Sequence, residues 1–395
     1  MSCFRALSGR LLDLKRQVDE LDGGVNACVV EKDLARGELP NETAVVAQLY
    51  LDEAEEIFNG FRASGLKTLS RVAVGRFYEA LIRAQVEVDK LVYSEVDPNS
   101  GWVEWEVLDC DLDRQDELIV NTQLLRLYLD GESGASIVEL DYKPRKANLV
   151  SFLHDEMGPT ENLQALLNIN QLPLLEPAVE VYDVAAGSKK SACVSHSVIS
   201  LRTPDLLGIK CRQDIEVSGT TQSTSWRTTL VKDFLFKSGI GAHCENATTG
   251  FSLAYSFSGV ELPPKNTLLA IEWNAMLPTA VPEAISICPL LSVGGISTKE
   301  RFSGAEKKWL SGEDVEGGLH GVRLIDGVSD LHVDIRASKQ LLGVSLVPLF
   351  ATQVMEEAWE GGNGSDYWGV RAVFVVKLAS DSGQFDAVSF FVSIL

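Results

Sequence analysis

Two carboxylates spaced two residues apart are the first candidates for chemistry. Glu139 and Asp141 stand in the run IVELDY, and on a strand both side chains point to the same face. Glycosyl transfer with retention needs two carboxyl groups about 5 Å apart, one nucleophilic and one proton-donating. The same spacing also suits an edge pair that is hydrogen-bonded to a neighbouring loop. Since a proton donor needs an apolar pocket that raises its pKa, the pattern favours a structural or sugar-contacting pair over a catalytic one.

A second candidate is the run LAIEWN, which carries Glu272, Trp273 and Asn274. An aromatic face packs on the C–H groups of a pyranose, while carboxylate and amide groups bind its hydroxyls. These three residues could therefore contribute to a sugar groove. The alternative is an inter-sheet hydrogen bond from Glu272 that fixes two strands.

Two tryptophans stand in a segment rich in turn residues. Trp359 and Trp368 enclose the sequence EGGNGSDY, and such polar, glycine-rich loops often carry binding residues. A loop that contacts glucan is one interpretation. The other is a plain hairpin connection.

Three aspartates, Asp109, Asp111 and Asp113, have the spacing of a calcium loop. An EF-hand would need a glycine at Arg114 and a glutamate at Val120, and the flanking runs are strand-like rather than helical. A solvated acidic hairpin turn fits the pattern better, so the three aspartates are weak metal candidates. The five histidines show no i, i+4 or HExxH spacing, and we expect no cofactor.

The elements that must position these residues change type near residue 98. Before it, apolar residues recur every three or four positions in three segments: Leu11, Leu14, Val18 and Leu21; Val46, Tyr50, Ala54, Ile57 and Phe61; Leu69, Ala73, Phe77, Leu81, Ala84, Val88 and Leu91. This spacing predicts amphipathic helices over residues 1–98. Three helices can cover one another only partly. We therefore expect the remaining apolar faces to lie against the β-sandwich that follows or against a missing domain. Without that domain, we expect them to bind another chain or to self-associate through residues 8–92.

After residue 98 the apolar spacing becomes two, beginning with Val103, Trp105 and Val107. Strand-like runs follow at 118–129, 135–142, 251–257, 267–276, 285–293, 331–335, 341–346, 370–378 and 388–395, and only residues 148–167 look helical. Many strands without alternating helices predict a large antiparallel β-supersandwich over residues 99–395. The expected fold class is mainly β with an N-terminal helical segment.

Charge and cysteine content limit the partners. The net charge is −21, which repels nucleic acid and anionic membranes but not a neutral glucan. The N-terminus lacks a signal sequence, and there is no run of 18 apolar residues, so we expect neither secretion nor a membrane span. Seven scattered cysteines without a paired motif indicate reduced thiols and a cytoplasmic protein.

Several segments in order resemble one enzyme family. They are LIRAQVEVD (81–89), DCDLDRQDE (109–117), GASIVELDYKP (134–144), ANL (147–149) and LAIEWN (269–274), with a weaker trace in Tyr182-Asp183 and Ser195-His196. From about residue 65 onward the chain is similar to the helical and C-terminal domains of family-57 glycoside hydrolases of the 4-α-glucanotransferase and α-amylase type. The resemblance implies a galactose-mutarotase-like sandwich and an α-glucan or oligosaccharide as ligand.

The chain departs from this family in two ways. The family's catalytic residues lie in an N-terminal (β/α) barrel, and no segment here alternates strand and helix in that way. Arg114 also stands where a turn glycine is usual. The resemblance therefore predicts a non-catalytic carbohydrate-interacting module. The alternative is a fragment or subunit of a 4-α-glucanotransferase that needs a separate catalytic barrel.

Overall fold

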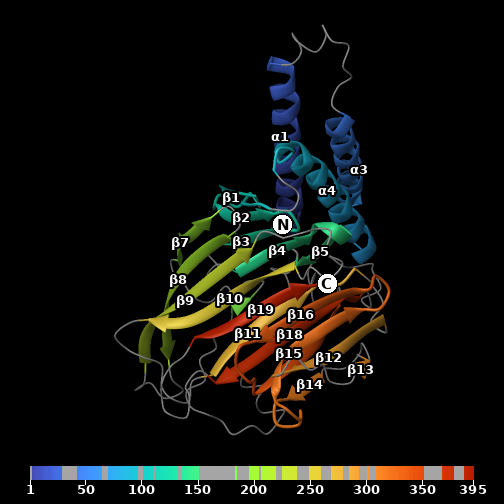
Figure 1. The fold of residues 1–395 in the computed structure, drawn as a ribbon. Coiled ribbons are helices and arrows are strands. Elements are labelled where there is room, and N and C mark those ends of the chain that lie inside the picture. The colour runs from blue at the N-terminus through green and yellow to red at the C-terminus, as the bar shows by residue number, and fades with distance from the viewer. Residues whose placement is uncertain are drawn as a thin grey trace.

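The computed structural model describes residues 2–28, 42–64, 70–96, 101–110, 112–130, 136–150, 183–184, 195–203, 206–218, 225–237, 249–258, 268–278, 284–292, 300–301, 308–350, 367–377 and 387–395. Helices stand at one end of the molecule, and strands form the rest (Figure 1). The predicted class, mainly β with an N-terminal helical segment, is confirmed for the part of the chain described. The domain boundary at 98/99 itself stays a prediction.

A small sheet lies directly beneath the helices, and we call it the helix-facing sheet (Figure 1). The helices are α1 (Ser2–Cys28), α3 (Glu42–Ser64) and α4 (Arg71–Val92). The sheet consists, in spatial order, of β1 (Val103–Leu108), β2 (Glu117–Thr122), β3 (Leu125–Asp130), β4 (Ser136–Tyr142) and β5 (Ala147–Val150). A 3₁₀ turn, η1 (Lys143–Arg145), joins the last two strands. Each strand pairs antiparallel with the next, so the sheet is a simple meander.

Two further sheets, of nine and five strands, form the sandwich. The nine-stranded sheet has the order β13 (Glu300–Arg301), β12 (Ile285–Leu291), β15 (Leu319–Asp326), β16 (Leu331–Ala337), β19 (Val388–Ile394), β10 (Thr249–Ser258), β9 (Ser225–Lys237), β8 (Leu206–Ser218) and β7 (Ser195–Thr203). The other has the order β14 (Lys308–Ser311), β17 (Gly343–Phe350), β18 (Tyr367–Lys377), β11 (Leu268–Ala275) and β6 (Asp183–Val184). The pairing is antiparallel apart from two residues of β6 beside β11, which confirms the predicted sheet type.

The helices bury their apolar faces within the chain. Helix α4 begins at Ser70, whose hydroxyl accepts a hydrogen bond from the Ala73 N–H and so caps the first turn. Leu11, Leu14, Val18 and Phe61 are buried in one cluster with α4 and with Met276 and Leu349 of the sandwich. The prediction that this stripe lacks cover was therefore wrong, because the helices and the sandwich together cover it. Self-association through residues 8–92 stays untested and loses that reason.

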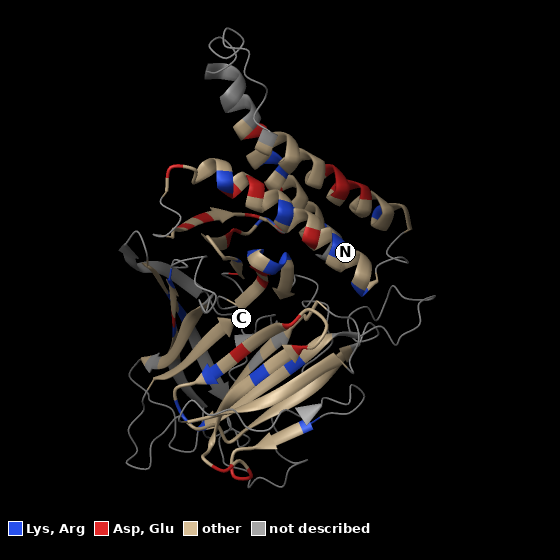
Figure 2. Ribbon diagram, turned by 45° about the vertical axis from the view of Figure 1, so that its right-hand side comes forward, with Lys and Arg blue, Asp and Glu red and all other residues tan. Residues whose placement is uncertain are grey.

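The helix-facing sheet is covered on both sides. Leu127, Leu140 and Leu149 join the large core of the sandwich, whereas Ile119 and Val138 pack with Ala6 of α1 in a separate small cluster. The helices carry many charged residues, while most of the length of the sandwich strands carries none (Figure 2). The helices therefore place charged side chains against a sheet whose other face is buried in the core of the sandwich.

Two further predictions from the sequence can be compared with the structure. Residues 148–150, predicted as the start of a helix, form part of strand β5, which pairs with β4; residues 151–167 lie outside the described part of the chain. Among the described residues, no helix is long and apolar enough to cross a membrane.

Gly343 carries the first stability prediction, because the ring of Trp309 packs against it across β14 and β17. A Cβ at residue 343 would lie 2.1 Å from the ring. We expect Gly343→Ala to lower the free energy of unfolding by about 1–3 kcal/mol through overpacking. Gly60→Ala is the matched control, since nothing lies within 4 Å of its added Cβ, and it should raise the stability of exposed helix α3 by about 0.5–1 kcal/mol. Urea titration measures both, and equal effects would contradict the packing argument.

Candidate functional site

Arg10 of α1 joins the two carboxylates that the sequence singled out. Its Nε donates a hydrogen bond to Glu139, and its Nη2 donates to Asp141 at 2.9 Å. The guanidinium carbon also lies 4.3 Å from the centre of the Tyr128 ring. Because successive side chains of β4 alternate around Leu140, Glu139 and Asp141 face the same helix, as their spacing predicted.

Other protein groups complete the surroundings of this pair. The Tyr78 hydroxyl of α4 donates to Glu139 at 3.3 Å, and the Asn148 amide of β5 donates to Asp141 at 2.9 Å. The exposed fraction is 0% for Glu139 and 2% for Asp141. A sugar could reach neither carboxylate in this arrangement. The alternative interpretation, an edge pair hydrogen-bonded to a neighbouring loop, is also corrected. The cation that binds both carboxylates is Arg10, on the distant helix α1.

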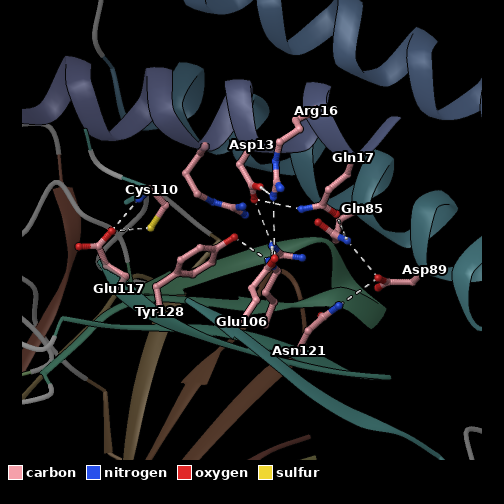
Figure 3. Close-up of polar contacts among 12 residues, drawn as sticks. Asp13, Arg16, Gln17, Gln85, Asp89, Glu106, Cys110, Glu117, Asn121 and Tyr128 are labelled. Atoms are coloured by element: carbon pink, nitrogen blue, oxygen red, sulfur yellow. Dashed lines mark hydrogen bonds and ion pairs between the residues drawn. The ribbon is translucent and has the colours of Figure 1, made fainter. Parts of the chain in front are cut away.

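A second cation continues the network along the sheet. Arg126 of β3 donates to Asp13 of α1 at 3.2 Å, to Glu106 of β1 at 3.0 Å and to the Tyr128 hydroxyl at 2.6 Å. Asp13 also accepts from Arg16 on the next turn of α1. Figure 3 shows Asp13 pointing from the helix toward the strands that carry Glu106 and Tyr128. The network therefore links α1 to strands β1 and β3 of the helix-facing sheet.

A third cation ties α4 to the same sheet. Lys143 of η1 donates to Asp89 of α4 and to Asn121 of β2, each at 2.6 Å, and to the Thr122 carbonyl. Asn121 also donates to Asp89 at 3.1 Å, a contact seen in Figure 3. Sequence reasoning missed Arg10, Arg126 and Lys143. Arg126 was signalled only as a single cation within the apolar run LLRLYL, and Lys143 only as part of the ELDYKP motif.

Burial and the charges of neighbouring groups shift the pKa values of this network in opposite directions. Burial raises the pKa of Glu139 to about 8, with Arg10 opposing the rise. Burial likewise raises the pKa of Asp141, again against Arg10. At Asp13, burial would raise the pKa, but Arg126 and Arg10 together hold it below its ordinary value. Burial lowers the pKa of Lys143, and Asp89 opposes that shift.

The remaining sugar-contact candidates lie elsewhere. Trp273 is buried in the sandwich core, 6.2 Å from Phe251 between ring centres, so it is a packing residue and not an open stacking platform. On the same strand, the backbones of Glu272 and Asn274 pair with Val373 and Arg371. Trp368 belongs to β18, and Trp359 lies outside the described residues. The structure does not bring these candidates together with Glu139 and Asp141.

The acidic turn between β1 and β2 is organised by backbone contacts. The Asp109 carboxylate accepts the N–H groups of Asp113 and Arg114, each at 3.0 Å. Arg114 adopts a φ of 80°, which lies in the left-handed region that favours glycine. Asp111 lies outside the described residues, and the residues that are described contain no group of three His, Cys, Asp or Glu able to hold a metal.

Comparison with known proteins shows that a protein-family model matches the segment that forms the centre of this site. Residues 109–155 match the C-terminal domain model of alpha-amylase/4-alpha-glucanotransferase. This segment includes β2 to β5 and therefore Arg126, Glu139, Asp141 and Lys143. No curated protein sequence matches the chain.

Solved structures are similar at low identity. The 4-alpha-glucanotransferase from Thermococcus litoralis is 15% identical with a TM-score of 0.47, covering 99% of this chain and 49% of that enzyme. A putative mutarotase from Salmonella typhimurium is 10% identical with a TM-score of 0.40, covering 76% and 94%. A galactose mutarotase-like protein from Clostridium acetobutylicum is 9% identical with a TM-score of 0.34, covering 75% and 99%. The chain spans about half the length of the glucanotransferase.

The resemblance stated from the motifs DCDLDRQDE and GASIVELDYKP falls within the matched segment. The helix-facing sheet thus carries the C-terminal domain signature of the alpha-amylase/4-alpha-glucanotransferase family, as the sequence motifs predicted.

Proposed function

We propose that this chain is a non-catalytic, α-glucan-interacting module of the 4-α-glucanotransferase and α-amylase type within glycoside hydrolase family 57. The family signature over residues 109–155 supports the glucan as the ligand class. The net charge of −21 is compatible with a neutral polyhydroxyl ligand and unfavourable for a polyanion. The proposed location is the cytoplasm, in keeping with the buried thiols of Cys110, Cys211 and Cys288.

The proposal that the chain is non-catalytic rests on one observation: the carboxylates of Glu139 and Asp141 are buried and hydrogen-bonded within the protein. Retaining glycosyl transfer requires both carboxyl groups to reach the scissile bond. Glu139 and Asp141 are instead saturated by Arg10, Tyr78 and Asn148 beneath α1. Substrate would have to displace the helix and leave Arg10 without its partners, so the pair serves to hold α1 on the sheet.

The experiment is binding without turnover. The full chain should be retarded on amylose in affinity electrophoresis, yet release no glucose and transfer no glucosyl unit from maltoheptaose above a protein-free blank. Turnover that Glu139→Gln abolishes and Glu53→Gln leaves intact would show an internal catalytic site and contradict the proposal. Glu53 is the matched control because it is exposed on α3.

A second candidate function is the C-terminal half of a two-part 4-α-glucanotransferase. It is supported by the exposed apolar residues Val45 (48% exposed) and Leu49 (61% exposed), which lie one turn apart on α3. A family-57 catalytic barrel, produced as a separate chain, should then gain transfer activity on maltoheptaose when this chain is added. Val45→Glu with Leu49→Glu should abolish the gain. An unchanged transfer rate on mixing would contradict this second function and leave the first as the one candidate.

A further inference from the structure

A cavity of about 520 Å³ lies where α4 ends against the helix-facing sheet. Its wall comes from the last turn of α4 and the residues after it, from the β2–β3 turn at Gln123, and from the β4–β5 connection at Lys143 and Lys146. The volume is within the range of about 300–1,000 Å³ typical of small-molecule sites. Gln123, Lys143 and Lys146 belong to the segment that carries the family signature.

Two stacked aromatic rings form part of this wall. Tyr93 and Trp102 have ring centres 3.7 Å apart and planes at 16°. The Tyr93 N–H caps α4 by donating to the Asp89 carbonyl at 2.9 Å, and the Lys143 amine lies 4.7 Å from the centre of the Trp102 ring. The rings are therefore fixed before any ligand binds. Both remain partly exposed, as residues that offer an aromatic surface to a pyranose must be.

Two of the three lysines that line the cavity, Lys90 and Lys143, have their charge compensated within the protein, which weakens the attraction for an anion. Lys143 is buried, and its three hydrogen bonds go to Asp89, Asn121 and the Thr122 carbonyl, so its charge is compensated within the protein. Lys90 is paired with Glu87 at 2.7 Å. Polar side chains around a mostly apolar, aromatic wall suit a ligand that presents C–H faces and hydroxyl groups.

We propose that this cavity, between the Tyr93–Trp102 ring pair and the β2–β3 and β4–β5 connections, is the site that holds an α-glucan chain. The site rests on the proposed function and gives it a place distinct from the buried carboxylate pair. The sugar packs on the aromatic wall, and Gln123 and Lys146 line the cavity within reach of its hydroxyls.

The test is calorimetric titration of the full chain with maltoheptaose. Tyr93→Ala should raise the Kd at least about ten-fold, the loss expected for an aromatic anchor. Phe391→Ala is the matched control, because Phe391 is an exposed aromatic residue (48%) on β19 of the sandwich, and it should change the Kd less than about two-fold. If Tyr93→Ala fails to fold, Ser94→Trp replaces it: Ser94 is exposed and lines the cavity, so the new ring should block the site and weaken binding equally.

The outcomes separate the two proposals. Binding by the wild type that both Tyr93→Ala and Ser94→Trp leave unchanged would overturn the cavity as the site and leave the glucan-binding function standing. A wild-type chain that binds no maltoheptaose at millimolar concentration would overturn both. Selective weakening by the cavity variants supports the assignment.

Discussion

Replacing Arg10 by methionine is expected to lower the free energy of unfolding by about 3–5 kcal/mol above pH 8, where Glu139 is mostly charged, the usual cost of removing one partner from a buried ion pair. The variant keeps much of the side-chain volume but leaves Glu139 and Asp141 buried without their cation. Desolvation of a carboxylate is costly only while the group stays charged. The loss should therefore shrink as the pH falls and the pair takes up protons. Urea unfolding at pH 5 and pH 9, on either side of the pKa of Glu139, measures both effects.

The control for Arg10→Met is Lys15→Met on the same helix. Lys15 pairs with Glu55 of α3, and both side chains are partly exposed, so this change should cost less than about 1 kcal/mol. The triple variant Arg10→Met, Glu139→Gln, Asp141→Asn should recover part of the loss, because it removes the unpaired charges as well. A loss for Arg10→Met no larger than that for Lys15→Met would contradict the role given to the ion pair.

The helices and most strands could be predicted because their patterns are local. Apolar residues at spacings of three and four gave α4 to within two residues at each end. For α3 the apolar stripe from Val46 to Phe61 lies inside the helix, four and three residues short of its ends. The alternation at Val103, Trp105 and Val107 gave β1. In α3 and α4 one face of the helix is buried against the rest of the chain, and burial of one face is what periodicity reports. In β1 only Val103 is buried and Val107 is 53% exposed, so the alternation located the strand without reporting a buried face.

Strands β8 and β9 were missed although their sequences carry a signal. In β8 the buried Leu207, Ile209 and Cys211 alternate with Gly208 and Lys210. Basic, acidic and hydroxyl residues interrupt the apolar runs of both strands, so neither run looked continuous. The thirteen-residue length of each strand also exceeds the usual five or six. Counting alternate positions, rather than apolar runs, would have found them.

The candidate site was predicted only in part, because its partners are distant in sequence. The spacing of Glu139 and Asp141 correctly placed both on one face. It could not identify Arg10, which is 129 residues from Glu139. Whether a strand carboxylate faces water or a cation depends on which element covers that face, and periodicity contains no information on that choice. The same limit explains why the cover of Leu11 and Phe61 was mispredicted.

The buried charges also explain how α1 finds one position on the sheet. Apolar contacts between a helix and a sheet tolerate sliding, whereas hydrogen-bonded ion pairs do not, since a shift leaves charges unsatisfied. Arg10 and Asp13 lie three residues apart on one face of α1 and meet partners of opposite sign, Glu139 and Arg126. A helix shifted by one turn would place like charges together. The network thus specifies the docking of the helix more than it adds stability.

The last prediction concerns pH, and it follows from the charge count beneath α1. Two buried cations, Arg10 and Arg126, face three buried acids, Asp13, Glu139 and Asp141. One proton would balance the set. Burial raises the pKa of Glu139 to about 8, with Arg10 opposing, so Glu139 is the group that holds this proton, and the Tyr78 hydroxyl lies beside it.

Because the folded protein binds this proton more tightly than the unfolded chain, its contribution is complete below the unfolded pKa of about 4.3 and is lost as the pH rises toward 8. We expect the free energy of unfolding to fall by on the order of a few kcal/mol between pH 5 and pH 8. The raised pKa of Asp141 acts in the same direction. The lowered pKa of Asp13 acts outside this window, below pH 4. The lowered pKa of Lys143 acts below its unfolded pKa of about 10.4 and in the opposite direction. Glu139→Gln should flatten the profile from pH 5 to 8, whereas Glu53→Gln should keep it. A wild-type profile that rises over this range would show that Glu139 is charged throughout.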